Sequence, residues 1–300
     1  MDATREFLRN AGLPTGDHFE QPASQLRFAD GGQFRIEIPS TEGPEALEAV
    51  IDEAAQRDVP IHRVSQGSGI MLQTDDELRR LRKLGDEHGI EISLFTGPRA
   101  SWDIGVQSTS PAGRVMGASL RGTDQLVYGI EDVRHACELG LRSVLVADLG
   151  QLWVLGKMKE SGELPSNLVL KVSVSLPVAN PATARVLQDL GATTLNLPVD
   201  LTSSQIGAIR QAVDCPLDIY IEAPDDFGSP LRYYEIPEIV RVAAPVYLKF
   251  TVRNSPGLYP SGGHLRGLAL ETARERVRRA EIGLSILRRY MPEAQASPKR

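Results

Sequence analysis

The sequence predicts a single α/β domain folded as a (β/α)8 TIM barrel, with a short N-terminal extension. First, β-branched runs alternate with amphipathic helical windows eight times from residue 34 onward, which is typical of βα units around a parallel sheet. Second, several strands carry polar side chains on one face and aliphatic ones on the other. Third, a length of 300 residues suits a barrel of about 250 residues with short extensions.

The alternation within strands distinguishes a barrel from an open doubly wound sheet. Lys171 and Ser173 alternate with aliphatic residues. The same pattern recurs in three further strands, Phe34–Ile38, Leu217–Glu222 and Val246–Arg253. Central strands of an open sheet are covered by helices on both faces and are therefore nearly all apolar. Half-polar strands favour a barrel whose lumen holds the polar side chains.

The elements follow one another in strict order. We expect strands at residues 34–39, 60–66, 91–97, 143–149, 168–176, 193–198, 217–223 and 246–253. We expect helices at residues 45–57, 75–88, 124–139, 151–160, 181–190, 203–213, 234–243 and 265–290. Thr74 and Glu77 have the spacing of a capping box, and Gly89, Gly140 and Gly191 lie where helices should end.

The regions outside these units define the domain boundaries. Residues 98–123 form a long Gly/Ser-rich connection after the third strand, which we interpret as a lid over the barrel mouth. We expect residues 1–33 to be an N-terminal extension over the barrel bottom or an edge. The barrel then spans 34–291, and 292–300 form a flexible tail.

Composition narrows the classes of partner. The formal net charge of −6, without a long Lys/Arg block, argues against a nucleic acid or membrane partner. Cys137 and Cys215 are too few and too far apart for a disulfide framework. The start lacks the features of a signal peptide, and no apolar run is long enough for a membrane span. We therefore expect a cytoplasmic protein with a small-molecule substrate, and a homo-oligomer is left open.

In a TIM barrel the site is built from strand C-termini and the loops that follow them. The candidate catalytic residues at these positions are Lys171, Glu222, Lys249 and Asp148. The candidate substrate-binding residues are Glu37, Arg63, Gln66, Arg99, Ser173, Asn196, Arg253, Gly262, Gly263 and His264. Cations outnumber carboxylates in this set, which predicts an anionic ligand, carboxylate or phosphate. The alternative is a set of structural ion pairs, such as Lys171 with Glu222.

Two glycine-rich loops could supply backbone donors to an anion. Ser65–Ile70 follows the second strand, and Tyr259–His264 precedes the last helix. Amide groups at a helix N-terminus favour an anion, and the loop after the eighth strand is a common phosphate position in barrels. Either loop could instead be an ordinary turn.

A carboxylate cluster closes the seventh strand. Glu222 and Asp225 are candidate ligands for Mg²⁺ or Mn²⁺, and Glu222 could alternatively act as a general base. Asp225 and Asp226 could instead initiate a turn. The histidine spacing does not fit a zinc site. No cofactor is certain from the sequence.

Three runs in the centre of the chain resemble the peptidase U32 family. They are Ala136–Gly150, Val172–Asn180 and Leu190–Thr202. This family consists of collagenase-like barrel proteins and includes relatives that work in ubiquinone and RNA hydroxylation. The resemblance covers about residues 125–225 and matches the family at Asp148, Ser173, Asn180 and Asp200.

The chain also departs from the family's pattern. Glu222-Ala-Pro224 stands where the family usually has His-Gly-Ala, and only Cys137 and Cys215 are present. The cysteine cluster that holds an iron–sulfur centre in many members is therefore missing, so we do not carry over a cluster or its hydroxylation chemistry. The peptidase name identifies no nucleophile here.

These observations lead to three hypotheses about function. The first is a U32-like TIM-barrel enzyme that acts on a small anionic substrate at the mouth, in lyase or aldolase fashion, with a lysine that forms a Schiff base. The second is a U32-type peptidase or another hydrolase. The third is a non-catalytic barrel that binds a metabolite.

Overall fold

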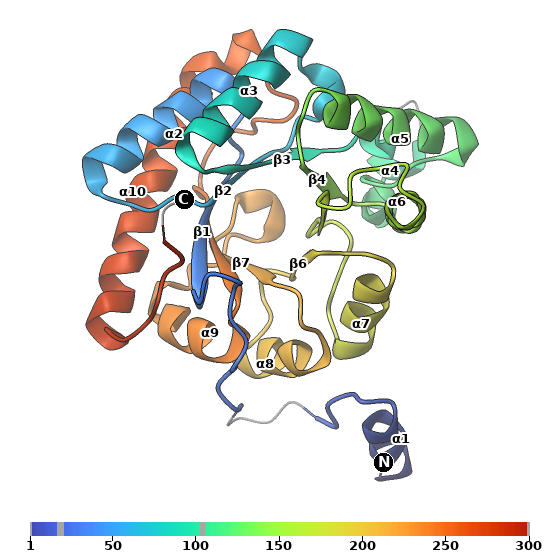
Figure 1. The fold of residues 1–300 in the computed structure, drawn as a ribbon, viewed down its shortest axis with the longest axis vertical. Helices are drawn as coiled ribbons and strands as arrows, with labels where there is room; N and C mark the ends of the chain where they lie inside the picture. The colour runs from blue at the N-terminus through green and yellow to red at the C-terminus, as the bar shows by residue number, and fades with distance from the viewer. Residues whose placement is uncertain (1, 17–20, 103–105, 299–300) are drawn as a thin grey trace.

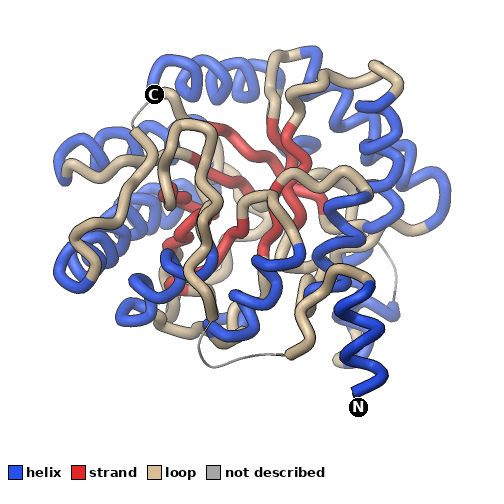
Figure 2. Tube along the Cα trace, turned by 60° about the horizontal axis from the view of Figure 1, so that its bottom comes forward, coloured by secondary structure: helices blue, strands red, loops and turns tan. Residues whose placement is uncertain are grey.

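The strands form a closed barrel. The computed structural model describes residues 2–16, 21–102 and 106–298. Eight parallel strands pair in chain order from β1 to β8, and β8 pairs with β1. The strands lie at the centre and the helices surround them (Figures 1 and 2). The predicted (β/α)8 fold is confirmed.

All strands except β1 are shorter than the runs that predicted them. Their bounds are β1 Phe34–Pro39, β2 Arg63–Gln66, β3 Glu91–Phe95, β4 Ser143–Val146, β5 Val169–Val172, β6 Thr194–Asn196, β7 Leu217–Glu222 and β8 Val246–Phe250. The difference lies mostly at the C-terminal ends, because the last residues of each run leave the sheet and enter the loops of the mouth.

Eight of the helices follow the predicted windows closely, and α1 and α4 lie outside those windows. Their bounds are α1 Asp2–Asn10, α2 Pro44–Arg57, α3 Asp75–His88, α4 Val106–Thr109, α5 Gly122–Glu138, α6 Leu149–Glu160, α7 Pro181–Asp189, α8 Ser203–Ala212, α9 Ile236–Ala243 and α10 Arg266–Tyr290. Short 3₁₀ helices lie at Ile70–Leu72, Ala100–Trp102, Ala112–Met116, Asp225–Phe227, Tyr233–Glu235 and Gly263–Leu265. None of the helices in the described part of the chain has the length and apolar character to cross a bilayer.

Side-chain caps fix several helix starts. Thr74 begins α3 with the predicted capping box, in which its Oγ1 accepts from the Glu77 amide. Thr202 caps α8 in the same way with Gln205. Asp148 caps α6 by accepting from the Gln151 amide at 2.8 Å. Such caps typically contribute about 1 kcal/mol each and set the point at which a mouth loop becomes a helix.

Strand register places the polar faces in the lumen. Glu37 on β1 lies beside Arg63 on β2 and Lys249 on β8. Lys171, Glu37 and Asp218 are 0% exposed. The aliphatic faces of the same strands pack outward against the helices in one large core.

A bulge interrupts the register at the end of β7. The pairing with β8 shifts between Tyr220 and Glu222. Glu222 therefore lies outside the lumen, where its Oε2 accepts from the Tyr233 hydroxyl at 2.6 Å and lies 3.6 Å from Arg279 Nε of α10. The expected grouping of Glu222 with the lumen residues was wrong, because a bulge re-aims the side chain that follows it.

The segment around Ser24 and Phe28 and the C-terminal segment lie against the barrel bottom, whereas α1 projects away from the barrel (Figure 1). The Ser24 amide donates to the Arg241 carbonyl in α9, and the Phe28 ring packs edge-on against Tyr247 of β8. Near the C-terminus, Ala296 forms a parallel bridge with Phe34, and Ser297 is only 3% exposed. Within the residues expected as a flexible tail, the structure thus places a backbone pairing with β1.

Candidate functional site

A cavity of about 520 Å³ opens at the C-terminal ends of the strands. Residues at or just beyond the C-terminal ends of all eight strands line it, together with residues of the mouth loops. Five of the predicted site residues line it: Gln66, Arg99, Ser173, Asn196 and Lys249. This is the face on which TIM-barrel enzymes bind their substrates.

Ion pairs fill the lumen beneath the cavity. Arg63 Nη1 lies 3.3 Å from Glu37 Oε2 and 3.2 Å from Asp218 Oδ1. Lys171 Nζ donates to Glu37 and lies 3.4 Å from Asp218 Oδ2. Lys249 Nζ lies 3.6 Å from Glu37 Oε1. Glu37 is therefore in contact with three cations, and Lys171 pairs with Glu37 and Asp218 and not with Glu222.

The charges of this network balance. Its members are Arg63, Lys171, Lys249, Glu37, Asp218 and Glu91, the last bound to Arg63 Nε at 2.9 Å. The inferred cationic excess was therefore wrong for the lumen, because Asp218 and Glu91 supply carboxylates that lie below the strand ends. Buried charges are expensive unless paired, and pairing within the lumen removes the need for a ligand at this depth.

Lys249 is the lysine that faces the cavity. Its Nζ donates to Asn196 Oδ1 at 2.5 Å and lies 4.1 Å from the centre of the Tyr220 ring. Burial lowers the pKa of Lys249, although Glu37 and Asp218 partly oppose this effect. Lys249 therefore has a larger neutral fraction at neutral pH than an ordinary lysine.

Lys171 lies one layer deeper and does not line the cavity. Burial lowers its pKa to about 8, against the opposing effect of Glu37. Burial would raise the pKa of Glu37, but Lys171, Lys249 and Arg63 outweigh it and hold that pKa below its ordinary value. Glu37 thus remains ionised, which makes it a weak base.

Two arginines line the cavity wall, Arg114, which is exposed, and Arg99. Arg99 is the buried one. Its guanidinium stacks on Phe95 at 3.7 Å and Trp102 at 3.9 Å, and Nη2 donates to the Gly67 carbonyl at 2.8 Å. The Nε atom is buried without a hydrogen-bond partner. Burial lowers the pKa of Arg99 to about 10, so it stays charged at neutral pH. Among the described residues, no carboxylate forms an ion pair with it.

The first glycine-rich loop does not offer the free amides that we expected. Glu42 accepts from the Gly67 amide at 2.7 Å and from the Ser68 amide at 3.2 Å. The Gly69 amide donates to Gln66 Oε1 at 3.0 Å. A carboxylate of the protein itself already occupies this group of donors, and burial raises the pKa of Glu42.

The other predicted residues lie away from the cavity. Asp148 caps α6, and its second oxygen accepts from the Leu120 amide at 3.1 Å. Arg253 and His264 are exposed, and neither lines the cavity. Gly262 and Gly263 border a separate depression of about 300 Å³ beside α10. This placement supports neither the predicted catalytic role of Asp148 nor the predicted substrate-binding roles of the other four residues.

The two proposed metal ligands do not converge. The oxygens of Glu222 contact Tyr233 and the Arg253 amide. Those of Asp225 accept from Ser229 and the Asn254 amide, so Asp225 holds a turn. In the part of the chain that the structure describes, no group of three or more His, Cys, Asp or Glu side chains is arranged to hold a metal.

Several cavity residues were missed by sequence reasoning. Tyr220 and Tyr259 line the cavity, and the Tyr259 hydroxyl bonds to Ser40 Oγ. Phe95 and Leu145 form part of its apolar wall. Tyr220 was detectable, because it alternates with Asp218 on the polar face of β7. Tyr259 was not, since it reaches the cavity from a loop.

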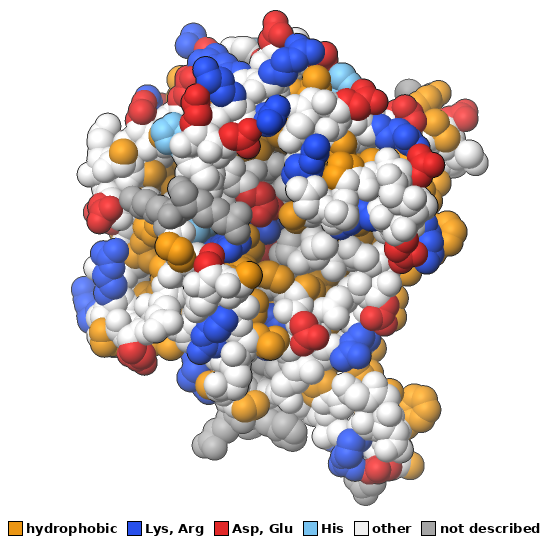
Figure 3. Space-filling view, viewed as in Figure 1, with side chains coloured by type: hydrophobic (Ala, Val, Ile, Leu, Met, Phe, Trp, Pro, Cys, Tyr) orange, Lys and Arg blue, Asp and Glu red, His pale blue; other side chains and the backbone are white. Residues whose placement is uncertain are grey.

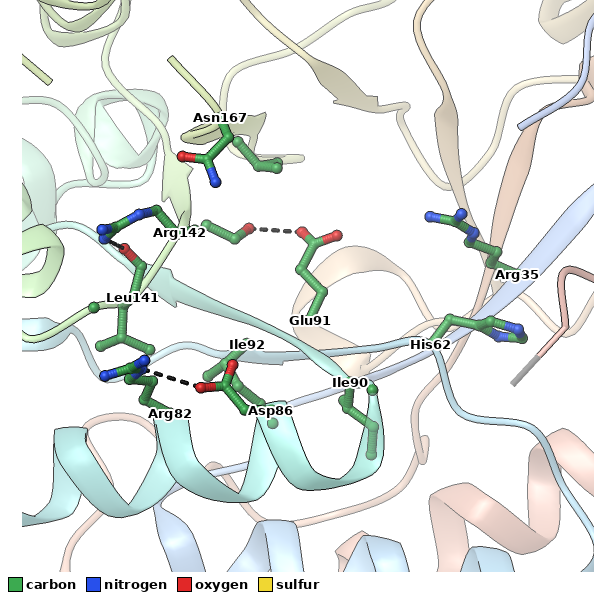
Figure 4. Close-up of a pocket in the computed structure, with 15 residues that line it drawn as sticks. Arg35, His62, Arg82, Asp86, Ile90, Glu91, Ile92, Leu141, Arg142 and Asn167 are labelled. Atoms are coloured by element: carbon green, nitrogen blue, oxygen red, sulfur yellow. Dashed lines mark hydrogen bonds and ion pairs between the residues drawn. The ribbon is translucent and has the colours of Figure 1, made fainter. Parts of the chain in front are cut away.

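A second cavity of about 480 Å³ lies at the opposite end, among the N-terminal ends of β3, β4 and β5 (Figure 4). Its charged groups are largely paired: Arg82 with Asp86 at 3.1 Å, and Glu91 with Ser143 at 2.7 Å and with Arg63. Acidic and basic side chains are interspersed over the face seen in Figure 3. Because this end of a TIM barrel usually serves stability, we place the candidate site at the mouth.

Comparisons with known proteins agree with this architecture. Residues 119–223 match the model of peptidase family U32. Many solved structures align with the chain, and the following three are among them. The U32 peptidase Mk0906 has a TM-score of 0.44 and 16% identity, over 78% of this chain and 96% of that chain. A putative lyase/mutase from Burkholderia cenocepacia J2315 has a TM-score of 0.45 and 15% identity, over 92% of this chain and 86% of that chain.

The third, described as a native KDPGal structure, has a TM-score of 0.46 and 10% identity, over 90% of this chain and 98% of that chain. No curated protein matched the chain.

Proposed function

On this peptidase U32-like barrel, whose resemblance is confirmed over residues 119–223, we propose an enzyme that binds a small carboxylate at the mouth. Arg99 holds the carboxylate of the substrate. Lys249 attacks its carbonyl group and forms a Schiff base, so that the reaction is of the lyase or aldolase type. The site would need no metal for this step, since the lysine itself supplies the electrophilic activation.

The placement of Lys249 carries the proposal. This lysine is buried, lines the cavity and has a pKa lowered by burial. A desolvated lysine next to other cations is the arrangement that activates an amine as a nucleophile. Burial is the main cause of the lowered pKa of Lys249, and the charge of Arg63 lowers it further, whereas Glu37 and Asp218 raise it.

The proposed step balances in atoms and charge. Neutral Nζ of Lys249 attacks the carbonyl carbon, the two protons of the amine pass to the carbonyl oxygen, and that oxygen leaves as water. Protonation of the resulting imine lets it accept the electron pair of the adjacent C–C bond when that bond breaks. Asn196, which binds Nζ through its Oδ1, would hold the nitrogen in position.

Borohydride trapping tests the proposal. The protein is incubated with pyruvate or phenylpyruvate and sodium borohydride, and the modified lysine is located by peptide mass mapping. We expect one adduct, on Lys249, that Lys249→Met abolishes. Lys83→Met is the matched control, because Lys83 is exposed on α3. Failure to trap any adduct, or adducts spread over surface lysines, would remove the Schiff-base mechanism.

The hydrolase alternative has weaker support. Ser65 lines the cavity, and its hydroxyl donates to Glu37 Oε1 at 2.7 Å. A serine nucleophile needs a base, and Glu37 is a poor one because its pKa is lowered by three cations. We therefore rank the peptidase function of the family below lysine chemistry. Specific ligand binding without any adduct would favour the non-catalytic alternative.

A further inference from the structure

The cavity at the mouth has two apolar sides. One small cluster contains Phe95, Leu145 and Ala147, with Ala118 packed against it. A second contains Val199, Tyr220 and Ala223, with Val174 and Phe227 packed against it. Both are separate from the main core between strands and helices.

Members of each cluster line the cavity, so apolar surface is exposed to its interior on two sides: Phe95, Leu145, Ala118, Val174, Tyr220 and Phe227. Apolar surface that a fold leaves open in a concave site typically marks the place of a ligand's apolar part.

Two buried cations of the cavity, Arg99 and Lys249, each lie next to one apolar cluster. Arg99 stacks on Phe95 of the first cluster, and Lys249 lies over Tyr220 of the second. A ligand that contacts both cations therefore also meets both apolar surfaces. Its charged group and its carbon skeleton are recognised side by side.

The polar side chains around the cations are already paired with each other. The amide of Gln66 donates to and accepts from Gly69. The amide of Asn196 donates to the Val172 carbonyl and accepts from Lys249. Few deep hydrogen-bonding groups thus remain for the hydroxyls of a sugar, and unpaired buried hydroxyls would weaken its binding.

A phosphate group is disfavoured by the same reasoning. The backbone amides of Gly67 and Ser68 would be the natural donors for phosphate oxygens, and Glu42 occupies both. The carboxylate of Glu42 would also repel a dianion. The buried guanidinium of Arg99, which has no ion-pair partner among the described residues, suits the single charge of a carboxylate, and the second arginine of the cavity, Arg114, is exposed.

From these contacts we infer that the mouth cavity takes an oxo monocarboxylic acid with an apolar body, aliphatic or aromatic, and not a phosphorylated or polyhydroxylated compound. This inference rests on the proposed function for the role of the carbonyl group, but the selection for an apolar body does not. A volume of about 520 Å³ lies within the usual range for ligand pockets and leaves room beyond a three-carbon acid.

Calorimetric titration with a matched series of probes tests the inference. The probes are pyruvate, 4-methyl-2-oxopentanoate, phenylpyruvate, 3-phenylpropionate and ribose 5-phosphate. Burial of apolar surface strengthens binding roughly fourfold per methylene. We therefore expect the two larger oxo acids to bind at least tenfold more tightly than pyruvate, and ribose 5-phosphate to bind more weakly than either.

A matched pair of variants locates the effect. Phe227→Ala removes apolar surface from a mouth loop, and Phe7→Ala removes the same atoms from an exposed helix far from the cavity. Only Phe227→Ala should weaken phenylpyruvate binding, and it should leave pyruvate binding nearly unchanged. Equal affinities for pyruvate and phenylpyruvate, or tighter binding of ribose 5-phosphate, would overturn the inference.

The two proposals fail separately. 3-Phenylpropionate has no carbonyl group and cannot form a Schiff base, so its binding reports the apolar body and the carboxylate alone. Binding of 3-phenylpropionate without borohydride trapping of phenylpyruvate would support the ligand class and reject the lysine chemistry. Borohydride trapping of pyruvate, together with no increase in affinity for ligands with an apolar body, would support the lysine chemistry and reject the ligand class.

Discussion

Lys171 and Lys249 lie against the same oxygen of Glu37. Lys171 Nζ donates to Oε1, and Lys249 Nζ is 3.6 Å from it. One buried carboxylate therefore contacts two lysines, from β5 and β8, which are not adjacent strands. The relationship links the reactivity of the cavity lysine to a residue that a substrate does not reach.

Loss of this carboxylate should destabilise the barrel. Glu37→Gln leaves the buried lysines with Asp218 as their remaining acidic partner, and breaking a buried ion pair costs about 3–5 kcal/mol. Urea denaturation measures the change. Glu48→Gln is the control, since Glu48 pairs with Arg80 on the surface, where a pair is worth about 0–1 kcal/mol. Equal effects of the two substitutions would contradict the network.

The stability of the protein should depend on Lys171 in alkaline solution. Burial lowers the pKa of Lys171 to about 8 in the folded chain, whereas an unfolded lysine titrates near its ordinary value of about 10.4. The folded state thus loses this proton at a lower pH than the unfolded state does. The free energy of unfolding therefore increases as the pH rises from about 8 to about 10.4.

Lys171→Met removes this titration and serves as the reference. The difference in unfolding free energy between the natural chain and this variant should shift in favour of the natural chain between pH 7 and pH 10. A difference that is constant over this interval would show that Lys171 titrates normally.

Carboxylate binding should require the planar guanidinium group of Arg99. Arg99→Met removes the charge, and Arg99→Lys keeps it but loses the stacking on Phe95 and Trp102. We expect both variants to weaken binding of 3-phenylpropionate at least tenfold in calorimetric titration. Arg79→Met, at an exposed ion pair on α3, should bind like the natural chain. Full retention by Arg99→Lys would mean that charge alone suffices.

Gly67 should tolerate no side chain. A Cβ atom at this position would lie 2.2 Å from Tyr259 Cε1, so Gly67→Ala must displace a ring that lines the cavity. Overpacking of this kind costs about 1–3 kcal/mol, and it should also weaken ligand binding. Gly257→Ala is the matched control, because nothing lies within 4 Å of its added Cβ. Thermal unfolding and titration of both variants decide the matter.

Local patterns predicted the fold well for a physical reason. Alternation of polar and aliphatic residues marks a strand with two different faces, and eight such runs with intervening helices leave few topologies. The same reasoning found Lys249 and Asn196, because each ends a strand on its polar face. Arg99 was found because it begins a loop directly after the third strand.

The remainder of the site depended on relationships between strands. The alternation of residues within one strand does not reveal how far that strand is shifted against its neighbours. In the folded barrel this shift places Asp218 beside Arg63 and Thr194. The carboxylate of Asp218 therefore balances cations that had no partner in the sequence pattern. The bulge in β7 reverses the direction of Glu222 and has no clear sequence signal. Tyr259 reaches the cavity from a long loop, whose path only the folded chain reveals.

The closed packing of the lumen restricts how substrates enter the protein and how products leave it. Glu37, Lys171 and Asp218 are fully buried between the two cavities, so nothing that enters at one end of the barrel can leave at the other. A substrate and its products must pass through the same opening of the mouth cavity, which Arg99 and Tyr259 line. The residues that line this opening therefore determine both the rate of product release and the selectivity for substrates.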